Sequence, residues 1–560
     1  MIKKFFILCI SVLLLSSCYD FLEPETRGSL MDNTYFTAKE QIEGYVNGLI
    51  RNGPMFSASP GVYSGSDLML GGWCAGMFDN LNYKGQEMFV IYVQEFGVTQ
   101  NNMNAKMGSY FGTNNYQPIT RCNKIIELYP TLNPVEFEMT QADLDRCVAE
   151  ARFYRAQHYF FLVRHFGDVP LVLNVPDAGD ELKVPRDDAT MIYNDVIIPD
   201  LLQAIAVLPV RSQYNNGMRI TAAVASAVLI DVYIQMAGYP IQDNSKWALA
   251  AAEAKKFLPG GVYASDHYLV QNEDFEELSA YNQFRSVGVS EASPGGRKTT
   301  SCPEFVYTLE FVQGITNAGF NANAWPMEVG ALGTSECRVA LTNNAYKPMP
   351  RYLDMYNADV DLRKKDRQFF SDYFDKRDGS FLYNNENNTP APYFFYDYGA
   401  VKGSSTASGR HWALYRLAEM YLFAAEAIAQ TEGVTAQAVD ALASVRARAY
   451  EWGGITKEEI VAQLQGLSKE KFIEEVWLER YRELVFENKQ WNQLQRTRVY
   501  PKTNSMDSSI PKGTAQFVDI TTVGTDFSKG QNFPLHYLLW CFPESQLQRN
   551  PNLTQNPGYN

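Results

Sequence analysis

Many patterns that mark catalytic or metal sites are missing from this chain of 560 residues. It has no Cys-x-x-Cys pair, no His-Glu-x-x-His, no Gly-x-Ser-x-Gly elbow and no glycine-rich nucleotide loop. Histidine is scarce, with five residues in all, and His158 and His165 lie seven apart in one helical segment, where packing or a surface position explains them better than metal binding. We therefore expect a protein that is not an enzyme, that uses no cofactor and that has no metal ion in its functional site; the sequence leaves a structural metal ion open.

Positive charge is also in short supply. The chain has 49 Lys and Arg against 63 Asp and Glu, for a net charge of −14. An acidic protein repels nucleic acid and other polyanions, so we expect no nucleic-acid partner. Hydrophobic residues make up 46% and aromatic residues 13%, which suits a globular protein with an excess of aromatic side chains. Those rings either stack on flat or sugar-like ligand faces or simply fill the core.

Long apolar runs are confined to the N-terminus. Lys3 and Lys4 precede an apolar run of about eleven residues, which is the length of a signal-peptide core and too short to span a membrane. The run ends in Leu15-Ser16-Ser17-Cys18, the pattern of a bacterial lipobox. We predict a signal peptide over 1–17, with Cys18 as the lipid attachment site and first mature residue. The alternative is an ordinary secreted protein in which Cys18 falls there by chance.

Cysteines are too sparse for a disulfide framework. Two of the eight lie in the predicted leader and at the lipid site. Six remain in an exported chain, so disulfides are allowed, but the sequence does not decide their pairing. The six are Cys74, Cys122, Cys147, Cys302, Cys337 and Cys541.

Helical periodicity dominates what is present. In the segment 149–171 apolar residues recur at spacings of four, three, four and three, and Gly167 and Pro170 end the pattern. Alanine-rich segments at 222–237 and 246–258, and again at 416–430 and 436–450, read as helical hairpins like tetratricopeptide (TPR) units. We predict a mostly α fold, with about four TPR-like helix pairs as a scaffold.

The middle of the chain breaks this periodicity. Residues 260–410 are rich in Asn, Gly, Ser and Tyr and read as long loops with short strands. We predict one domain over 18–560, made of a helical part at 18–258, a loop-rich insertion at 259–410 and a C-terminal part at 411–560. Long loops on a rigid scaffold commonly carry function, so we expect them to form the ligand face.

Five segments resemble the signatures of the RagB/SusD family, in the family's order. They are AEARFYRAQHYFFLVRHFGDVPL (149–171), RLAEMYLFAAEAIA (416–429), ALASVRARA (441–449), ERYRELVFENKQWNQLQR (479–496) and FPESQLQRNPNLTQNPGYN (542–560). With the lipobox they run from Cys18 to the end of the chain. Gln490 and Gln493 stand where the family usually has Arg and Asp, and Gln546 where it has Glu. Amides in place of an ion pair indicate a structural contact.

The resemblance implies a surface lipoprotein of the Bacteroidetes outer membrane. Such proteins bind an oligosaccharide or polysaccharide and sit as a lid on a SusC-like TonB-dependent transporter. The acidic residues Asp20, Glu23 and Glu25 after the lipobox are similar to the family's signal for export to the outer face. In the RagB branch the cargo is peptide, which is the alternative for this chain.

Carboxylates give little support to an enzyme. A glycosidase needs two of them roughly 5–10 Å apart across the bond to be cut. Glu419 and Glu426 share one helix face but rise about 10.5 Å apart along it, so we interpret them as partners of Arg residues in neighbouring helices. The cluster Asp361, Arg363, Asp366 and Arg367 likewise reads as solvated or ion-paired. A bare TPR scaffold is disfavoured by the long aromatic loops.

Two loops combine aromatic rings with polar side chains that can form hydrogen bonds to the hydroxyls of a sugar. Segments 71–86 and 317–328 each place rings beside amides, as stacking and hydrogen bonding to sugar require. The alternative is that these rings pack on the scaffold beneath the loops. The predicted ligand-binding residues are Trp73, Phe78, Asn80, Tyr83, Phe320, Asn321 and Trp325.

Overall fold

The computed structural model describes most of the chain after the predicted leader. The described residues are 36, 38–50, 65–79, 96–175, 183–214, 219–289, 291, 296–311, 320–321, 347–375, 381–383, 390–394, 396–398, 407–524 and 533–559. The predicted signal peptide, Cys18 and the acidic residues after it lie outside these ranges. The fold is mostly helical, as the sequence predicts.

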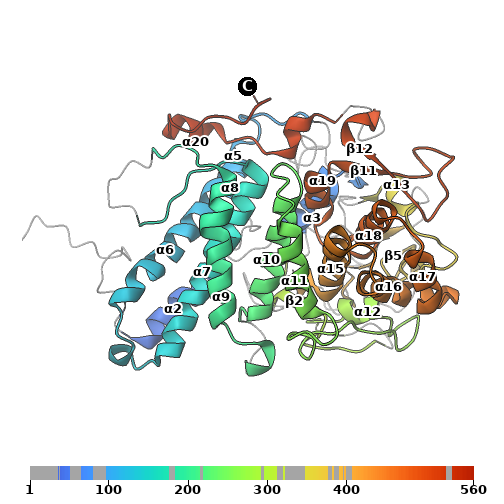
Figure 1. Ribbon diagram of the computed structural model, residues 1–560, viewed down its shortest axis with the longest axis horizontal. Helices are drawn as coiled ribbons and strands as arrows, with labels where there is room; N and C mark the ends of the chain where they lie inside the picture. Colours follow the sequence, from blue (N-terminus) through green and yellow to red (C-terminus); the bar gives the residue numbers. More distant parts are fainter. Residues whose placement is uncertain are drawn as a thin grey trace, which may run out of the picture.

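Eight helices stand in a row and form the scaffold (Figure 1), each in contact with the next. Within the described residues this row corresponds to four pairs, the number expected from the sequence. The helices are α6 (Gln117–Leu128), α7 (Gln141–Phe166), α9 (Ile198–Val207), α10 (Ala222–Ala237), α11 (Lys246–Ala254), α15 (Leu417–Glu432), α16 (Ala436–Tyr450) and α17 (Lys457–Gln465).

The longest helix, α7, is bounded by local signals. Thr140 caps its first turn and forms a reciprocal capping box with Asp143. Its end comes at Gly167, whose φ of 74° lies in the left-handed region that favours glycine. The segment 149–171 therefore ends its helix where the sequence predicts.

Helices α10 and α15 are apolar around most of their circumference because neighbours cover them on several sides. All residues of α10 from Ala222 to Ala237 are buried, against α9, α11 and α15. Helix α11 contacts α15 directly, although about 160 residues separate them in the chain. The insertion thus leaves the row after α11, and the row resumes with α15.

The helical run 189–207 is long and apolar enough, by composition, to cross a membrane. It consists of α8 (Ala189–Ile192), a π-helical turn (Tyr193–Ile197) and α9. In the structure α9 packs between α7 and α10, as a scaffold helix does. Asp200 of this run is buried and binds Arg155 of α7 at 2.7 Å.

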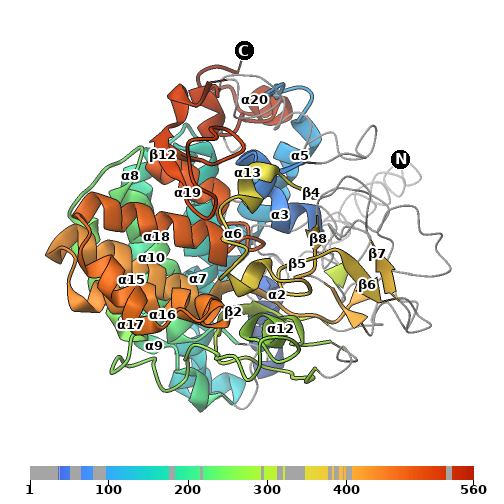
Figure 2. The same ribbon diagram turned by 90° about the vertical axis from the view of Figure 1, so that its right-hand side faces the viewer.

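The short strands β4 to β8 lie on the side of the molecule away from the helical row (Figure 2). Among the described residues the strands form antiparallel two-stranded pairs. The pairs are β1 (Phe78–Asp79) with β4 (Lys347–Pro348), β2 (Phe305–Leu309) with β10 (Trp412–Arg416), β3 (Phe320–Asn321) with β9 (Ala407–Ser408), β5 (Phe370–Ser371) with β8 (Ala391–Pro392), β6 (Tyr373–Asp375) with β7 (Phe381–Tyr383), and β11 (Val499–Lys502) with β12 (Gln516–Asp519).

Further helices fill the space around the row. Helix α18 packs on α15 and α16, and α19 contacts α3. The remaining helices are α2 (Lys39–Ile50), α3 (Gly65–Cys74), α5 (Asn104–Gly108), a π-helical segment (Ser109–Tyr116), α12 (Ala280–Arg285), α13 (Pro350–Leu353), α18 (Lys469–Glu483), α19 (Gln490–Thr497) and α20 (Glu544–Arg549).

A buried ion network ties the insertion to the scaffold. Glu483 of α18 accepts hydrogen bonds from Arg416 and Arg448 at 2.7 and 2.5 Å, and from Arg363 at 3.0 Å. Glu304, just before β2, binds the same Arg416 and Arg448 at 2.7 and 2.6 Å. Burial alone would raise the pKa of Glu483, but the three guanidinium groups hold it below its usual value. Removing one charged side chain from this network would leave the opposite charges of its buried partners without compensation.

The carboxylates considered as catalytic candidates are structural. Glu419 binds Arg480 at 2.8 Å, and Glu426 binds Arg496 at 2.7 Å, as the sequence predicts for partners of Arg in neighbouring helices. Asp361 and Arg363 form a fully buried pair at 2.8 Å.

The amides in the fourth family segment are structural too. Gln490 donates to the Leu484 and Val485 carbonyls at 3.0 and 2.7 Å, and Gln493 accepts from Arg480 and Arg496 at 3.0 and 2.6 Å. Of the six cysteines left open by the sequence, five are described, and each is a free, buried thiol. Cys337 lies outside the described residues.

Candidate functional site

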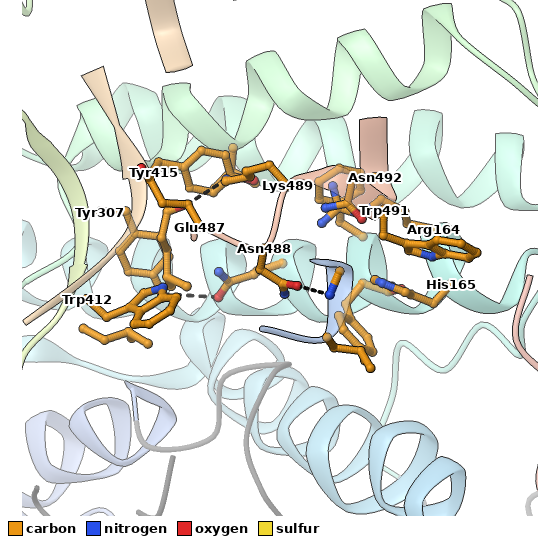
Figure 3. A pocket seen from close by; sticks show the side chains of 18 of the residues that line it. Arg164, His165, Tyr307, Trp412, Tyr415, Glu487, Asn488, Lys489, Trp491 and Asn492 are labelled. Carbon is orange, nitrogen blue, oxygen red and sulfur yellow. Dashed lines mark hydrogen bonds between the residues drawn. The ribbon is translucent and has the colours of Figure 1, made fainter. Parts of the chain in front are cut away.

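A cavity of about 100 Å³ lies between the helical row and the β2–β10 pair (Figure 3). Helices α7 and α10 form one wall, the two strands another, and α3, α19 and Trp540 close the rest. That volume holds several waters or one end of a small polar ligand. The lining residues are Leu70, Gly71, Gln157, Phe160, Phe161, Arg164, His165, Val228, Tyr307, Leu309, Trp412, Leu414, Tyr415, Glu487, Asn488, Lys489, Trp491, Asn492 and Trp540.

Aromatic side chains make up much of the lining. Tyr307 of β2 and Trp412 and Tyr415 of β10 come from the strand wall, whereas Trp491 comes from α19. Trp540 packs on His165 with ring centroids 4.3 Å apart, and the backbone N–H of Trp540 donates to the backbone carbonyl of His165 at 2.6 Å. Rings held this firmly offer fixed apolar faces to a ligand.

The charged groups of the lining are neutralised by partners. Lys489 pairs with Glu419 at 2.7 Å and lies 3.9 Å from the Tyr415 ring centroid. Arg164 pairs with Asp231 at 2.9 Å. Burial alone would raise the pKa of Asp231, but Arg164 and Lys489 keep it below its usual value. A neutral ligand suits such a wall better than a strongly charged one.

Glu487 presents one carboxylate oxygen that is not used. Its Oε1 accepts from Arg416 at 2.7 Å, whereas its buried Oε2 has no hydrogen-bond partner among the described residues. Burial raises the pKa of this carboxyl, and Arg416 offsets that rise only in part. Glu487 lines the cavity, but this oxygen is itself covered by protein.

Trp491 lies in the same lining and has an unpaired donor. Its Nε1–H is covered by protein and has no partner within the part of the chain that the structure describes. A buried polar group without a partner costs about 1–3 kcal/mol. Asn488 has a structural role beside it, since its Oδ1 accepts from the backbone N–H of Gly71.

His165 contributes no charge at neutral pH. Burial and the neighbouring Arg164 lower the pKa of the imidazole to about 3. Its Nδ1 lies 2.8 Å from the Phe161 carbonyl oxygen and so carries the proton. The ring therefore acts as a neutral spacer between Phe161 and Trp540.

Two of the predicted ligand residues, Trp73 and Phe78, are core residues in this structure. Trp73, near the end of α3, is 2% exposed and Phe78 is 1% exposed. The Phe78 ring packs on Tyr352 and Phe486 at centroid distances of 5.1 and 5.8 Å. A stacking platform needs an open ring face, which neither of these side chains has, so both match the packing alternative instead.

The structure does not test the other predicted ligand residues. Asn80, Tyr83 and Trp325 lie outside the described residues. For Phe320 and Asn321 the structure describes only the backbone, as strand β3 paired with β9. Their ligand contacts stay a prediction.

Sequence reasoning missed the residues that line the cavity. Glu487 and Trp491 stand in the segment 479–496, which we used only as a family signature and in which we interpreted Gln490 and Gln493 as a structural contact. Tyr307 and Trp412 belong to short apolar strands more than 100 residues apart, and only their pairing brings them together. An aromatic residue in each strand was the available signal, but it is equally typical of core.

Fold and cavity define the class of protein: stacked helix pairs that carry a strand-and-loop layer, with a neutral aromatic cavity between the two. Two family models match the chain, one described as SusD family over residues 343–559 and one as "Starch-binding associating with outer membrane" over residues 76–234. Together these two matches support a SusD-like family protein.

Relatives and solved structures agree with this assignment. The chain is 24% identical over 570 residues to SusD-like protein P2 of Formosa agariphila, and the match covers 100% of both chains. It resembles the structure of a SusD superfamily protein from Parabacteroides distasonis, with a TM-score of 0.72 and 24% identity, covering 93% of this chain and 99% of that one. A laminarin-binding SusD-like protein matches with a TM-score of 0.65 and 20% identity, covering 94% and 100%. These structural likenesses show the fold.

Proposed function

We propose that the protein is a surface lipoprotein that binds a glycan and delivers it to a SusC-like TonB-dependent transporter in the outer membrane. In this proposal residues 1–17 are the signal peptide, and Cys18 carries the lipid and begins a single domain over 18–560. The family assignment, the lipobox and the outer-membrane description of one matching model support this location. The laminarin-binding neighbour and the starch-binding description of that model support glycan as the cargo.

One observation carries the proposal, namely a cavity lined by aromatic rings in which each charged side chain is paired. A sugar is neutral and offers C–H faces that pack on such rings. The paired charges of the wall favour a neutral ligand of this kind.

The same lining supports binding without catalysis. Hydrolysis of a glycosidic bond ordinarily needs two carboxylates placed across it. Glu487 is the one carboxylate among the residues that line the cavity, and its Oε1 is held by Arg416. We propose a protein that is not an enzyme and that captures its ligand by stacking and hydrogen bonding.

Binding is tested with the full chain purified in detergent, by calorimetry and affinity gels against starch, laminarin and other soluble polysaccharides. We expect at least one glycan to bind, and Trp491→Phe to weaken that binding about tenfold, because the smaller ring presents less apolar face to the sugar, worth about 1.4 kcal/mol. Trp247→Phe is the matched control, since Trp247 is also buried but lies in α11 away from the cavity.

No binding across the panel would overturn the proposal. Binding of peptides but of no polysaccharide would replace the glycan with the peptide cargo of the RagB branch. Equal losses of glycan affinity in Trp491→Phe and Trp247→Phe would show that the cavity is not part of the binding site.

Delivery to a transporter needs its own experiment. A tagged copy of the full chain, expressed in its own host and purified from solubilised outer membranes, is expected to bring a TonB-dependent transporter with it. A Cys18→Ala copy serves as the control for membrane attachment. Recovery of the wild-type chain from outer membranes without a transporter would contradict the proposed handover.

A further inference from the structure

A second cavity, which the proposed function does not use, lies between strand β2 and the start of α10. Its volume is about 410 Å³, a size within the range of small-molecule sites, whereas the aromatic cavity offers about 100 Å³. Tyr307 of β2 lines both cavities, but the rest of their linings do not overlap. The second cavity can therefore bind a ligand of a different class.

Two side chains of opposite charge line this cavity without pairing with each other. Arg211 begins a short 3-10 turn after α9, and Glu310 directly follows β2. The Arg211 guanidinium is held by the backbone carbonyls of Cys302 and Phe305, at 3.1 and 3.4 Å. Among the described residues Arg211 has no carboxylate partner, and Glu310 has neither a hydrogen bond nor a salt bridge. The cavity thus contains one free cation and one free anion.

Both charged groups are within reach of a ligand. Arg211 and Glu310 are half-buried, and neither contributes to the unpaired polar atoms that protein covers in the described part of the chain. Burial raises the pKa of Glu310, and the charge of Arg211 opposes that rise, so the two groups lie close enough to interact. A partly desolvated charge without a partner gains from a ligand group of opposite sign.

The other basic side chains in the lining add no free charge. Arg219 pairs with the buried Glu150 at 3.1 Å. His267 and His411 are neutral at pH 7, because burial lowers the pKa of each imidazole to about 4. A ligand therefore meets a single positive group and a single negative group.

Buried apolar side chains make up another part of the lining. Ile220, Val224, Val287 and Val306 are each at most 6% exposed. These side chains offer no hydrogen bonds, so this part of the cavity suits an apolar group of the ligand.

This combination restricts the chemistry of the ligand. A carboxylate alone would pair with Arg211 but would be repelled by Glu310, and an ammonium group alone would meet the reverse problem. A neutral ligand would leave both charges without a partner. A zwitterion carries a carboxylate, which a guanidinium binds through parallel hydrogen bonds, and an ammonium group, which donates to a carboxylate.

We propose that this cavity binds a small zwitterion, namely a free α-amino acid with an apolar side chain. Arg211 binds its carboxylate, Glu310 binds its ammonium group, and the apolar lining holds its side chain. The site is separate from the glycan site proposed above. Each added residue of an extended peptide moves the terminal charges about 3.5 Å further apart, so a peptide fits this pair of charges less well.

The probes separate the two charges of the ligand. They are L-leucine, 4-methylpentanoate, which lacks the ammonium group, 3-methylbutylamine, which lacks the carboxylate, and the peptide leucyl-glycyl-glycine. The measurement is calorimetry at pH 7 on the full chain in detergent. We expect leucine to bind, and each of the other three probes to bind at least tenfold more weakly.

Glu310→Gln tests the anionic side of the site and spares the fold, because Glu310 makes no bond among the described residues. We expect it to weaken leucine binding at least tenfold and to leave 4-methylpentanoate binding as strong as before or stronger. Its matched control is Glu474→Gln, since Glu474 lies in α18 outside this lining.

Arg211→Gln tests the cationic side of the site. We expect it to weaken the binding of leucine and of 4-methylpentanoate, but not that of 3-methylbutylamine. Arg549→Gln is the matched control, because Arg549 is exposed at the end of α20 and lies outside the lining.

Three results would overturn the proposal: no binding of leucine, a peptide or 4-methylpentanoate that binds as tightly as leucine, or unchanged leucine affinity in Glu310→Gln. Glycan binding is measured on the same variants and should stay at the wild-type level. Absence of glycan binding in the wild type would overturn the proposed function while leaving the amino-acid site standing.

Discussion

Buried histidines show how strongly the environment acts on single residues here. His158 and His165 are close to fully buried in α7, and burial lowers the pKa of each to about 3. His158 Nδ1 lies 3.0 Å from Asn115 Oδ1, and its Nε2 has no partner among the described residues. The sequence placed both in a helix and favoured packing over metal binding, and their burial agrees with that interpretation.

These histidines predict a pH dependence of stability. In the unfolded chain a histidine titrates near pH 6.5. Below that pH the histidine binds a proton in the unfolded state but stays neutral in the folded state. The stabilisation is complete above about pH 6.5 and is lost as the pH falls towards 3. We expect the free energy of unfolding, measured with urea between pH 6.5 and 4.5, to fall by up to about 1.4 kcal/mol per pH unit for each histidine.

The variant His165→Phe isolates one of the two contributions. Phenylalanine preserves the ring contacts with Phe161 and Trp540, which lie 4.2 and 4.3 Å away by centroid. The slope of unfolding free energy against pH should therefore become shallower, whereas His536→Phe, at a partly exposed position, should change it less. An unchanged slope in His165→Phe would contradict the assignment.

At the scale of elements, local signals set where α7 starts. Thr140 Oγ1 accepts from the Asp143 N–H at 3.1 Å, and Asp143 Oδ2 accepts from the Thr140 N–H at 3.3 Å. The Thr140 hydrogen bonds lower the pKa of Asp143, although some burial opposes them. These bonds satisfy N–H groups that the first turn would otherwise leave open.

Removing this cap gives a prediction at the element scale. Thr140→Ala should lower the free energy of unfolding by about 1 kcal/mol, because a first-turn N–H loses its partner. Urea denaturation at pH 7 measures the change, and Thr554→Ala, at an exposed position outside any helix, is the control. A loss of less than about 0.3 kcal/mol would show that packing alone sets the start of α7.

Across the whole molecule, the buried ion network joins segments that are far apart in sequence. Glu304 precedes β2, Arg416 ends β10, Arg448 lies in α16, and Glu483 ends α18. Charges buried at this depth are stable only as a complete set, since each carboxylate compensates the desolvation of several guanidinium groups. The insertion and the scaffold therefore depend on each other.

Glu483→Gln tests this dependence. It leaves three buried arginines short of a charge partner, and we expect the free energy of unfolding to drop by about 3–5 kcal/mol. The control is Glu474→Gln in the same helix, where Glu474 makes an exposed pair with Lys471 at 2.7 Å and should cost less than about 1 kcal/mol. Equal losses of unfolding free energy in the two variants would mean that the buried network contributes no more to stability than an exposed ion pair.

The sequence could predict features that depend on residues close together along the chain, but not features that depend on residues far apart. The end of α7 and both limits of α10 follow from glycine and periodicity within one segment, and the structure confirms them. Helix α7 starts at Gln141, before the segment at 149 that the sequence singled out. The partners of Glu419 and Glu426 were predicted as Arg residues, because a carboxylate on a buried helix face needs a cation. The aromatic cavity could not be predicted, because Tyr307, Trp412 and Trp491 meet only through strand pairing and helix packing.

The sequence by itself determined the helical row, the break in it at 260–410 and the family, because these depend on local periodicity and on ordered short motifs. Tertiary structure alone decided which aromatic rings are core and which line a cavity. Trp73 and Trp491 are alike in sequence terms, each a tryptophan in a short helix, yet only Trp491 lines the aromatic cavity. Whether a ring faces packed neighbours or open space is set by residues hundreds of positions away, and no local pattern records that.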